Sequence, residues 1–188
     1  MWGLRGLPLR VLSFHWRARR AAQRIDDRFS LTSVTRPADL RVLLALARGC
    51  RQIVELGTAT GWTAITVALD DLERRVVTYD PVERVEPHRY LALVAPDVRA
   101  RIKLVVAPGS TGPQDPEPVD LLYIDSSHER EQTINEVRAW QPHLRPGAAV
   151  LFDDYTNPDF PGVQEAIKEL GLAGEQRGTL FVHRHPIA

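Results

Sequence analysis

The sequence predicts an α/β protein built on one mostly parallel sheet, with helices on both faces of the sheet and an antiparallel edge. Three observations support this prediction. Short apolar runs alternate with helix-period segments, the last two apolar runs are separated only by a glycine turn, and no internal repeat interrupts the alternation. The 188 residues, 44% of them hydrophobic, suffice for one domain with a sizeable core.

Residues 1–24 carry arginines and no acid, interleaved with apolar side chains. The apolar run is too short to span a membrane or to serve as a signal peptide. We therefore expect a basic amphipathic segment over residues 1–35 in front of a main domain over residues 36–188. Three roles stay open for the segment: a docked or solvated helix, a flap over a substrate, and a helix lying on an anionic membrane surface.

Helix-breaking residues and the periodicity of hydrophobic residues divide the main domain into helices and strands. Residues 26–35 are expected to form a loop, after which Pro37 opens a helix that Gly49 stops. The prolines of residues 107–118 exclude a long helix there, and Ser126-x-x-Glu129 has the pattern of a capping box. The expected strands are 52–56, 76–80, 101–106, 119–125, 148–154, 172–176 and 179–183, and the further helices are 62–69, 82–93, 126–143 and 161–170.

The chain is organised around residues 53–62, where an apolar strand reaches Glu55 and then passes through Gly57 and Gly61 into a helix. Glycine permits a positive φ or a close backbone approach, and the start of a helix presents free amides to a ligand. The spacing differs from the G-x-G-x-x-G dinucleotide fingerprint, and Glu55 suits a cation better than a pyrophosphate. The plain alternative is a turn that only packs helix on strand.

This stretch, Glu55-Leu56-Gly57-x-x-x-Gly61, resembles motif I of the class I S-adenosylmethionine (SAM) methyltransferases. Asp80 ends the second strand, where an acid in such folds bonds ribose hydroxyls. Its alternative role is a helix cap or a turn. Gly109 and Ser110 follow the third strand, where a nucleoside-binding fold would contact adenine.

Composition excludes several functional classes. The 24 basic and 24 acidic residues cancel, so the overall charge gives no indication of nucleic-acid binding. The single cysteine, Cys50, cannot form an internal disulfide, and a reducing cytoplasm is the expected compartment.

A second group of acids follows the fourth and fifth strands. In a parallel sheet the carboxyl ends of these strands share one rim with Glu55 and Asp80, so Asp125, Asp153 and Asp154 should lie close together. Their mutual repulsion favours a hard divalent cation bound between them. His128, expected on the first turn of the next helix, is placed to accept a proton there; the alternative is a structural or exposed histidine.

Four further stretches carry a more specific resemblance, which covers about residues 40–183. They resemble the methyltransferase family that contains the macrocin and mycinamicin sugar O-methyltransferases and the cephalosporin-hydroxylase-associated proteins, and more distantly catechol O-methyltransferase. The stretches are Tyr123-Ile124-Asp125-Ser126-Ser127-His128, Trp140-x-x-x-Leu144-Arg145-Pro146-Gly147, Phe152-Asp153-Asp154-Tyr155 and Pro161-Gly162-Val163-x-x-Ala166-Ile167.

The resemblance implies a Rossmann-like seven-stranded sheet, His128 and Asp125 as catalytic residues, and Mg²⁺ or another divalent cation on Asp125, Asp153 and Asp154. Many relatives have histidine or glutamate at the position of Asp153, which leaves the metal open. The implied SAM-binding residues are Glu55, Gly57, Thr58, Gly61, Trp62, Asp80, Gly109, Ser110 and Asp125.

The expected function is SAM-dependent O-methylation of a hydroxyl on a small molecule or a glycosylated metabolite. The alternatives are a non-catalytic SAM-binding or partner-binding module and a hydroxylase-associated protein on the same scaffold. A small or open acceptor pocket is expected at Trp62, Tyr155, Phe160 and the N-terminal segment, although Tyr155 and Phe160 equally suit core packing. Peripheral membrane contact and a homo-oligomer stay open.

Overall fold

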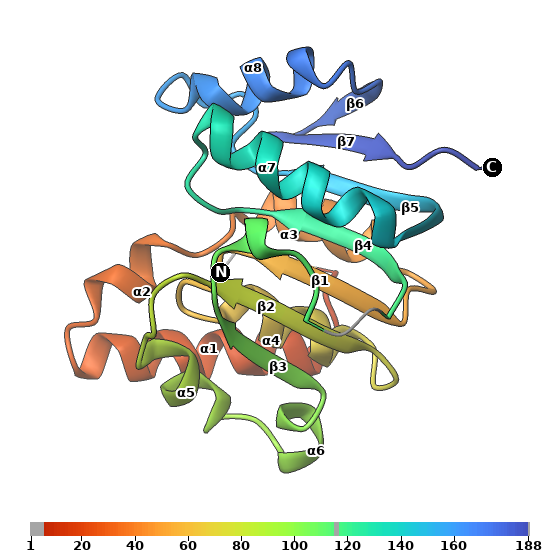
Figure 1. The fold of residues 1–188 in the computed structure, drawn as a ribbon. Helices are drawn as coiled ribbons and strands as arrows, with labels where there is room; N and C mark the ends of the chain where they lie inside the picture. The colour runs from red at the N-terminus through yellow and green to blue at the C-terminus, as the bar shows by residue number, and fades with distance from the viewer. Residues whose placement is uncertain (1–5, 115–116, 188) are drawn as a thin grey trace.

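The computed structural model describes residues 6–114 and 117–187. A seven-stranded sheet in the order β3-β2-β1-β4-β5-β7-β6 forms its centre (Figure 1). The strands β1 to β5 pair in parallel, whereas β7 runs antiparallel to both β5 and β6. This confirms the predicted fold class. The strands are β1 Gln52–Leu56, β2 Arg75–Asp80, β3 Ile102–Val106, β4 Val119–Ile124, β5 Leu144–Phe152, β6 Gly174–Arg177 and β7 Leu180–Arg184.

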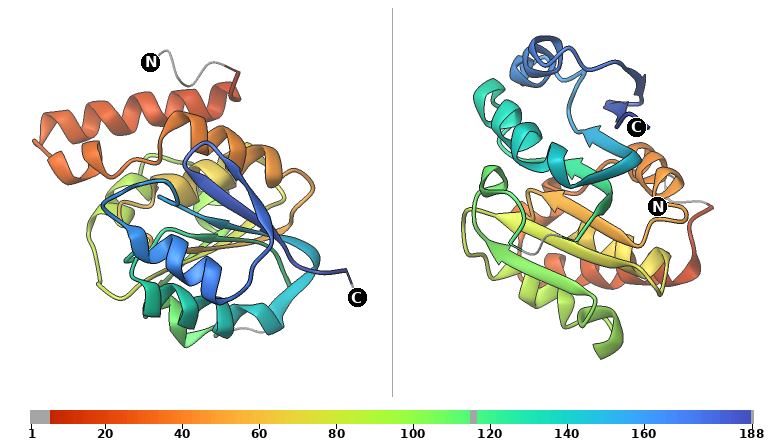
Figure 2. Two further views of the ribbon diagram at one scale, coloured as in Figure 1. Left: turned by 90° about the horizontal axis from the view of Figure 1, so that it is seen from above. Right: turned by 45° about the vertical axis from the view of Figure 1, so that its right-hand side comes forward.

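Helices cover both faces of the sheet. Figure 2 shows α1 as the outermost layer on one side and α7 with α8 on the other. The helices are α1 Leu9–Arg24, α2 Arg28–Thr32, α3 Pro37–Leu46, α4 Trp62–Asp70, α5 Glu86–Leu91, α6 Pro96–Arg99, α7 Arg130–Trp140 and α8 Pro161–Glu169. Two short 3₁₀ helices, η2 Gly109–Thr111 and η3 Gln141–His143, join them.

The sheet is buried on both faces because successive side chains of a strand point to opposite sides. In β1, Ile53 packs in the core under α1, α3 and α4, whereas Val54 packs in the core under α7 and α8. Leu121 and Leu122 of β4 divide in the same way. Continuous apolar strands of this kind are typical of a parallel sheet covered on both sides, which fixes the carboxyl ends of the strands in one rigid frame.

The N-terminal helix α1 is docked on the main domain. Its apolar side packs against α4, and Phe14 at its centre is fully buried. His15, also buried, makes a 2.9 Å hydrogen bond from Nε2 to Oγ1 of Thr66, and burial lowers the pKa of His15 to about 4. The docked-helix interpretation therefore describes residues 9–24, while residues 1–5 of the predicted segment lie outside the described part. No helix in the described ranges is long and apolar enough to cross a membrane.

Several helix boundaries differ from the prediction. The segment 82–93 was expected to be one helix, but α5 begins only at Glu86, because the Asp80 carboxylate accepts the Val82 amide at 3.0 Å and holds the chain in a turn. The Ser126-x-x-Glu129 capping box does not form. Ser126 Oγ instead donates to Glu136 at 2.8 Å, and α7 begins at Arg130. Residues 26–35, expected to be loop, contain α2, and α6 was not predicted.

The strand ends also shift. Residues 144–147 were expected to form a turn before the fifth strand, but they belong to β5, which joins β4 through a register shift between Val119 and Leu121. Asp125, Asp153 and Asp154 then follow their strands instead of lying in them. The acids therefore lie in the loops beyond the sheet, where backbone conformation is less restricted.

Candidate active site

The glycine turn after β1 is tightly built into the sheet. Gly57 has a φ of +107°, and its amide donates to the Tyr79 carbonyl at 2.8 Å. A Cβ added at Gly57 would lie 1.8 Å from the Asp125 carbonyl oxygen, so glycine is required by the neighbouring strand itself. Gly61, with a φ of +75°, caps the N-terminus of α4. A substitution at Gly57 would therefore disturb the fold before it tested ligand binding.

Glu55 lies beneath this turn, with 3% of its surface exposed. Thr78 Oγ1 donates to its carboxylate at 2.5 Å, and Thr58 Oγ1 lies 2.7 Å from that hydroxyl. Burial, together with the charges of Asp125 and Asp80 and against the opposing effect of the Thr78 bond, raises the pKa of Glu55 to about 8. A cation bound near the turn would favour the ionised form.

Asp80, at the end of β2, is held by the backbone. Its carboxylate accepts the amides of Ala59 and Val82, each at 3.0 Å. The Arg84 guanidinium lies 3.4 Å from the same carboxylate and also over the ring of Phe29, 5.0 Å from its centroid. The predicted ribose-binding acid is thus at the rim, next to an arginine and to a side chain of the N-terminal segment.

Trp62 does not line a pocket. Its side chain is 2% exposed and contacts the ring edges of Phe14 and Tyr90, with centroids 6.1 Å and 5.1 Å away. The expectation that its indole shapes the acceptor site is wrong, because α1 covers that face of α4. Tyr155 packs on Phe181, with centroids 4.9 Å apart, and both side chains line a cavity of about 520 Å³ beside α8.

Gly109 and Ser110 form the 3₁₀ helix η2, which packs against α7. Trp140 Nε1 donates to the Gly109 carbonyl at 2.8 Å, and Gln132 Nε2 donates to Ser110 Oγ at 3.4 Å. A Cβ added at Gly109 would meet the Glu136 carboxylate at 2.7 Å. These contacts give the residues a packing role that the sequence did not indicate.

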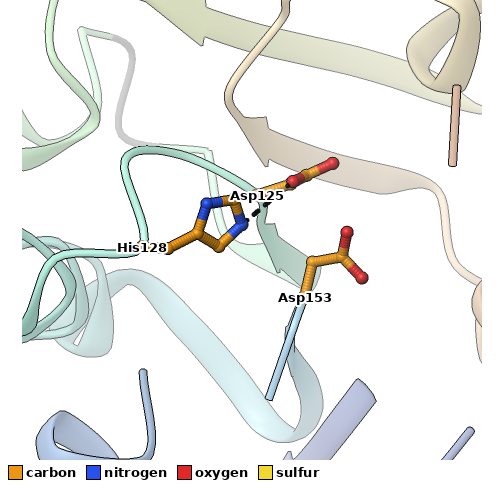
Figure 3. Close-up of side chains that lie close together, drawn as sticks. All are labelled: Asp125, His128 and Asp153. Atoms are coloured by element: carbon orange, nitrogen blue, oxygen red, sulfur yellow. Dashed lines mark ion pairs between the residues drawn. The ribbon is translucent and has the colours of Figure 1, made fainter. Parts of the chain in front are cut away.

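The carboxyl ends of β4 and β5 bring Asp125, His128 and Asp153 together, with one ligand atom from each within 4.8 Å of the others (Figure 3). His128 Nε2 lies 3.3 Å from Asp125 Oδ1. At this edge His128 Nε2, Asp153 Oδ1 and Asp154 Oδ1 are buried and have no well-directed hydrogen-bond partner among the described residues. Buried polar atoms without partners are costly, so this cluster fits a bound cation or a polar ligand.

His128 lies in the loop before α7 and not on the helix, which corrects the prediction. Its backbone is left-handed, with a φ of +59°, and its ring stacks on Phe160 at 4.5 Å between centroids. Phe160 was expected to line the acceptor pocket. Gly162 supports the loop from the other side, since a Cβ there would lie 2.7 Å from the His128 carbonyl oxygen and 2.5 Å from the Arg130 nitrogen. The ring is thereby turned toward Asp125.

Asp154, predicted as the third carboxylate of the cation site, lies beside this cluster and also contacts an arginine. Its φ is +53°, and its Oδ1 lies 3.0 Å from Arg36 NH2. Its other oxygen lies 4.0 Å from His128 Nε2. The residues that converge most closely are therefore two carboxylates and an imidazole.

Burial and mutual repulsion perturb the acids of the cluster. Burial raises the pKa of Asp153 to about 8, and the charges of Asp125 and Asp154 add to the effect. Burial also raises the pKa of Asp125, although its contact with His128 opposes the shift. Burial, with the charge of Asp125, raises the pKa of Tyr123, whose hydroxyl donates to Asp125 at 3.3 Å. Perturbed acids in one place are characteristic of functional sites.

Sequence reasoning missed three parts of this site: Arg36, Tyr123 and Gly162. Arg36 lies in a segment read as loop, and no local pattern pairs it with Asp154, 118 positions later. Tyr123 and Gly162 stood in the motifs, but their contacts with Asp125 and His128 depend on the packing of β4 and α8.

A cavity of about 590 Å³ lies elsewhere, along β1 to β3 beside Pro113, Glu117 and Val119. Its lining includes Val54, Val77, Tyr79 and Trp140, and none of the predicted site residues. The prolines after β3 prevent a helix from covering this face of the sheet. The chemistry therefore gathers at the carboxyl edge of the sheet and not in the larger cavity.

A methyltransferase-domain family matches residues 54–155, more than half of the chain. The motif I residues from Glu55 onward, Asp125, His128 and the Asp153-Asp154 pair all fall in the matched range. No curated protein matches the chain.

Several solved structures share the fold. CalS11, a TDP-rhamnose 3′-O-methyltransferase of calicheamicin biosynthesis, is 23% identical over 78% of each chain, with a TM-score of 0.62. TomG from Streptomyces achromogenes, an O-methyltransferase solved with SAM, is 21% identical over 93% of this chain and 90% of its own, with a TM-score of 0.65. An O-methyltransferase from Bacillus cereus, solved with SAH, is 16% identical over 89% of each chain, with a TM-score of 0.62.

Proposed function

From the premise that this chain belongs to the methyltransferase-domain family and is a class I SAM-dependent methyltransferase, we propose that it methylates a hydroxyl oxygen. The observation that carries the proposal is the cluster of Asp125, His128 and Asp153 at the carboxyl edge, beside the glycine turn. An acceptor hydroxyl needs a group that takes its proton.

In the proposed reaction the acceptor oxygen attacks the methyl carbon of SAM. A carbon–oxygen bond forms, the carbon–sulfur bond breaks, and its electron pair stays on the sulfur of S-adenosylhomocysteine. His128 accepts the hydroxyl proton at Nε2, which is buried and has no well-directed partner among the described residues. The stack on Phe160 keeps the imidazole in position for this transfer.

The glycine turn, Glu55 and Asp80 form the proposed SAM site. Glu55 would balance the positive charges of the donor, and the raised pKa of Glu55 indicates how strongly its surroundings lack a cation. Asp80 would meet the ribose hydroxyls through Oδ1, because the Arg84 contact is to Oδ2. The amides at the start of α4 face the same rim.

A divalent cation fits the acidic cluster. Asp125, Asp153 and Asp154 would hold it, because Asp125 and Asp153 are acids of raised pKa and Oδ1 of both Asp153 and Asp154 is buried without a well-directed partner in the described structure. Hard carboxylate oxygens suit Mg²⁺ or Mn²⁺. A cation bound there would lower the pKa of the acceptor hydroxyl. Asp153 and Asp125 would keep it beside His128.

The acceptor class proposed is a hydroxyl on a small molecule or a glycosylated metabolite. The support is that CalS11, which shares the fold, is a TDP-rhamnose 3′-O-methyltransferase. Phe29 of α2 lies beneath the Arg84 guanidinium that contacts Asp80, and the half-exposed Arg36 contacts Asp154, so both segments border the proposed rim.

The test is S-adenosylhomocysteine release by the full chain with SAM and a panel of sugars, catechols and nucleotide-linked sugars, in Mg²⁺ and in EDTA. We expect acceptor-dependent release that EDTA abolishes, and an Asp125→Ala variant that binds SAM but does not turn over. Full activity in EDTA would refute the cation. Tight SAM binding with no transfer to any acceptor would favour a non-catalytic binding module.

A further inference from the structure

The outward side of α1 carries positive charge and no acid. The helix contains five arginines and no acidic residue. One of them, Arg10, donates to the Asp70 carbonyl at the end of α4. The other four are exposed and form no salt bridge with any acid in the described ranges: Arg17, Arg19, Arg20 and Arg24. Although the whole chain has a formal charge of zero, this face is locally cationic.

The acids of the neighbouring segments are paired with arginines outside α1. Two of these acids follow α1 directly, and two lie at the end of α4. Each has a carboxylate oxygen within 3.9 Å of a guanidinium nitrogen, in the pairs Asp26–Arg28, Asp27–Arg89, Asp70–Arg74 and Asp71–Arg74. The exposed arginines of α1 are therefore available to an anionic partner.

Large apolar side chains are exposed in the same layer. Among the described residues, four of the nine large hydrophobic side chains that are exposed lie between positions 9 and 29: Leu9, Trp16, Ile25 and Phe29. Leu9, Trp16 and Arg20 are spaced by seven and four positions, which places them on one face of the helix. The Arg20 guanidinium lies over the Trp16 ring, 4.7 Å from its centroid. Tryptophan and arginine both combine an apolar body with a polar end, which suits the boundary between water and lipid.

The buried side of α1 keeps this face directed outward. Phe14 is fully buried, and His15 is bonded to Thr66 of α4. Figure 2 shows α1 lying along the surface as the outermost layer. The helix has 16 residues, so it can lie along a bilayer without crossing it.

Three kinds of partner can be compared for this face. In a symmetric contact with a second copy of the chain, arginines would face arginines, and like charges repel. A nucleic acid would neutralise the arginines through its phosphates but would leave Leu9 and Ile25 without an apolar environment. An anionic bilayer offers both negative headgroups and an apolar boundary.

We propose that the outward face of α1 binds the anionic surface of a lipid bilayer. The arginines contact the headgroups, and Trp16 and Leu9 enter the boundary between headgroups and acyl chains. The contact is peripheral, because the apolar side of α1 stays packed on α4. The proposal is independent of the proposed function, since it involves none of the residues of the candidate active site.

Sedimentation of the full chain with lipid vesicles tests the proposal. Vesicles of phosphatidylcholine with about one-third phosphatidylglycerol should bind the parent, whereas vesicles of phosphatidylcholine alone should not, and high salt should weaken the binding. The double variant Arg17→Gln/Arg24→Gln should partition about 20–30-fold less, because each arginine near an anionic surface contributes about fivefold. Trp16→Ser, which leaves the charge unchanged, should partition about tenfold less.

A matched control removes two charges from the opposite side of the molecule. Arg138 of α7 and Lys168 of α8 are exposed, so Arg138→Gln/Lys168→Gln lowers the formal charge by the same amount and should change partitioning by less than about twofold. Equal losses in the two double variants would overturn the assignment to α1. A parent that ignores anionic vesicles, or that binds an oligouridylate RNA instead, would also refute the proposal. If the α1 double variant does not fold, Trp16→Ser decides alone, and partitioning like that of the parent would overturn the proposal.

Discussion

The acidic cluster should make the cation-free protein less stable as the pH rises, and Asp153→Asn should remove much of that loss. The pKa of Asp153 is raised from an ordinary 3.8 to about 8 by burial and by Asp125 and Asp154. Between those values the folded protein keeps a proton that the unfolded chain has released. Stability is therefore full at the acid end of this window and is lost as the pH rises toward 8.

The size of the effect follows from proton linkage. One retained proton corresponds to about 1.4 kcal/mol of unfolding free energy per pH unit. From about pH 6 to about pH 7.5, Asp153 should therefore contribute a loss of about 2 kcal/mol, or about 4–8 °C in melting temperature for a domain of this size. Glu55, whose pKa is also raised to about 8, acts in the same direction. The difference in pH-dependent stability between the parent and Asp153→Asn gives the contribution of Asp153 alone.

The assay is thermal and urea unfolding of the parent and of Asp153→Asn in EDTA, at the two pH values. The variant should be more stable than the parent near pH 7.5. Between the two pH values, its free energy of unfolding should fall by about 2 kcal/mol less than that of the parent. Asp97→Asn, at an exposed position of α6, serves as the control and should follow the parent. Added Mg²⁺ should restore the stability of the parent near pH 7.5 and leave the stability of Asp153→Asn unchanged.

Equal pH dependence in parent and variant would refute the reasoning. It would mean that Asp153 is already ionised in the folded protein and that no cation is needed to hold the cluster together. If Mg²⁺ restored the stability of both proteins, the cation would bind at a site other than Asp153. The experiment needs no acceptor, so it tests the site before the substrate is known.

Three further predictions concern the base, its support and the N-terminal helix. His128→Ala should lower turnover by about 10²–10⁴-fold, and part of the lost turnover should return at high pH, while SAM and Mn²⁺ still bind. Product assays at fixed times measure the turnover, and calorimetry measures the binding. Turnover like that of the parent would exclude the role of His128 as the base. Gly162→Ala should destabilise the fold by about 1–3 kcal/mol and reduce turnover, because its Cβ meets the backbone of the His128 loop; an unchanged melting curve would contradict the close contact. Phe14→Ala should cost about 3–5 kcal/mol in urea unfolding, whereas Leu9→Ala, 84% exposed, should cost almost nothing; equal effects would mean that α1 is not docked.

The sequence by itself determined the sheet and the acidic rim. Alternating apolar runs specify strands buried on both faces, and parallel strands bring their carboxyl ends to one edge. This is why Glu55, Asp80, Asp125 and Asp153 could be placed together without coordinates. Local periodicity and the position of each acid at a strand end were sufficient.

Only the tertiary structure decided how the side chains are used. The capping-box pattern before α7 predicted a helical His128, but Ser126 bonds Glu136 instead, and Gly162 and Phe160 hold the histidine in a left-handed loop. A local cap contributes only about 1 kcal/mol, so contacts with α8 can override it.

The same limit explains Trp62 and Arg36. Trp62 follows the glycine turn and had the sequence context of a ligand contact, but α1 covers it, and a contact between residues 14 and 62 leaves no local pattern. Arg36 meets Asp154 only because α3 and the loop after β5 converge at the β6–β7 turn. Periodicity records which face of an element is buried. It does not record which distant charge reaches a given carboxylate, because that depends on how the packed elements converge.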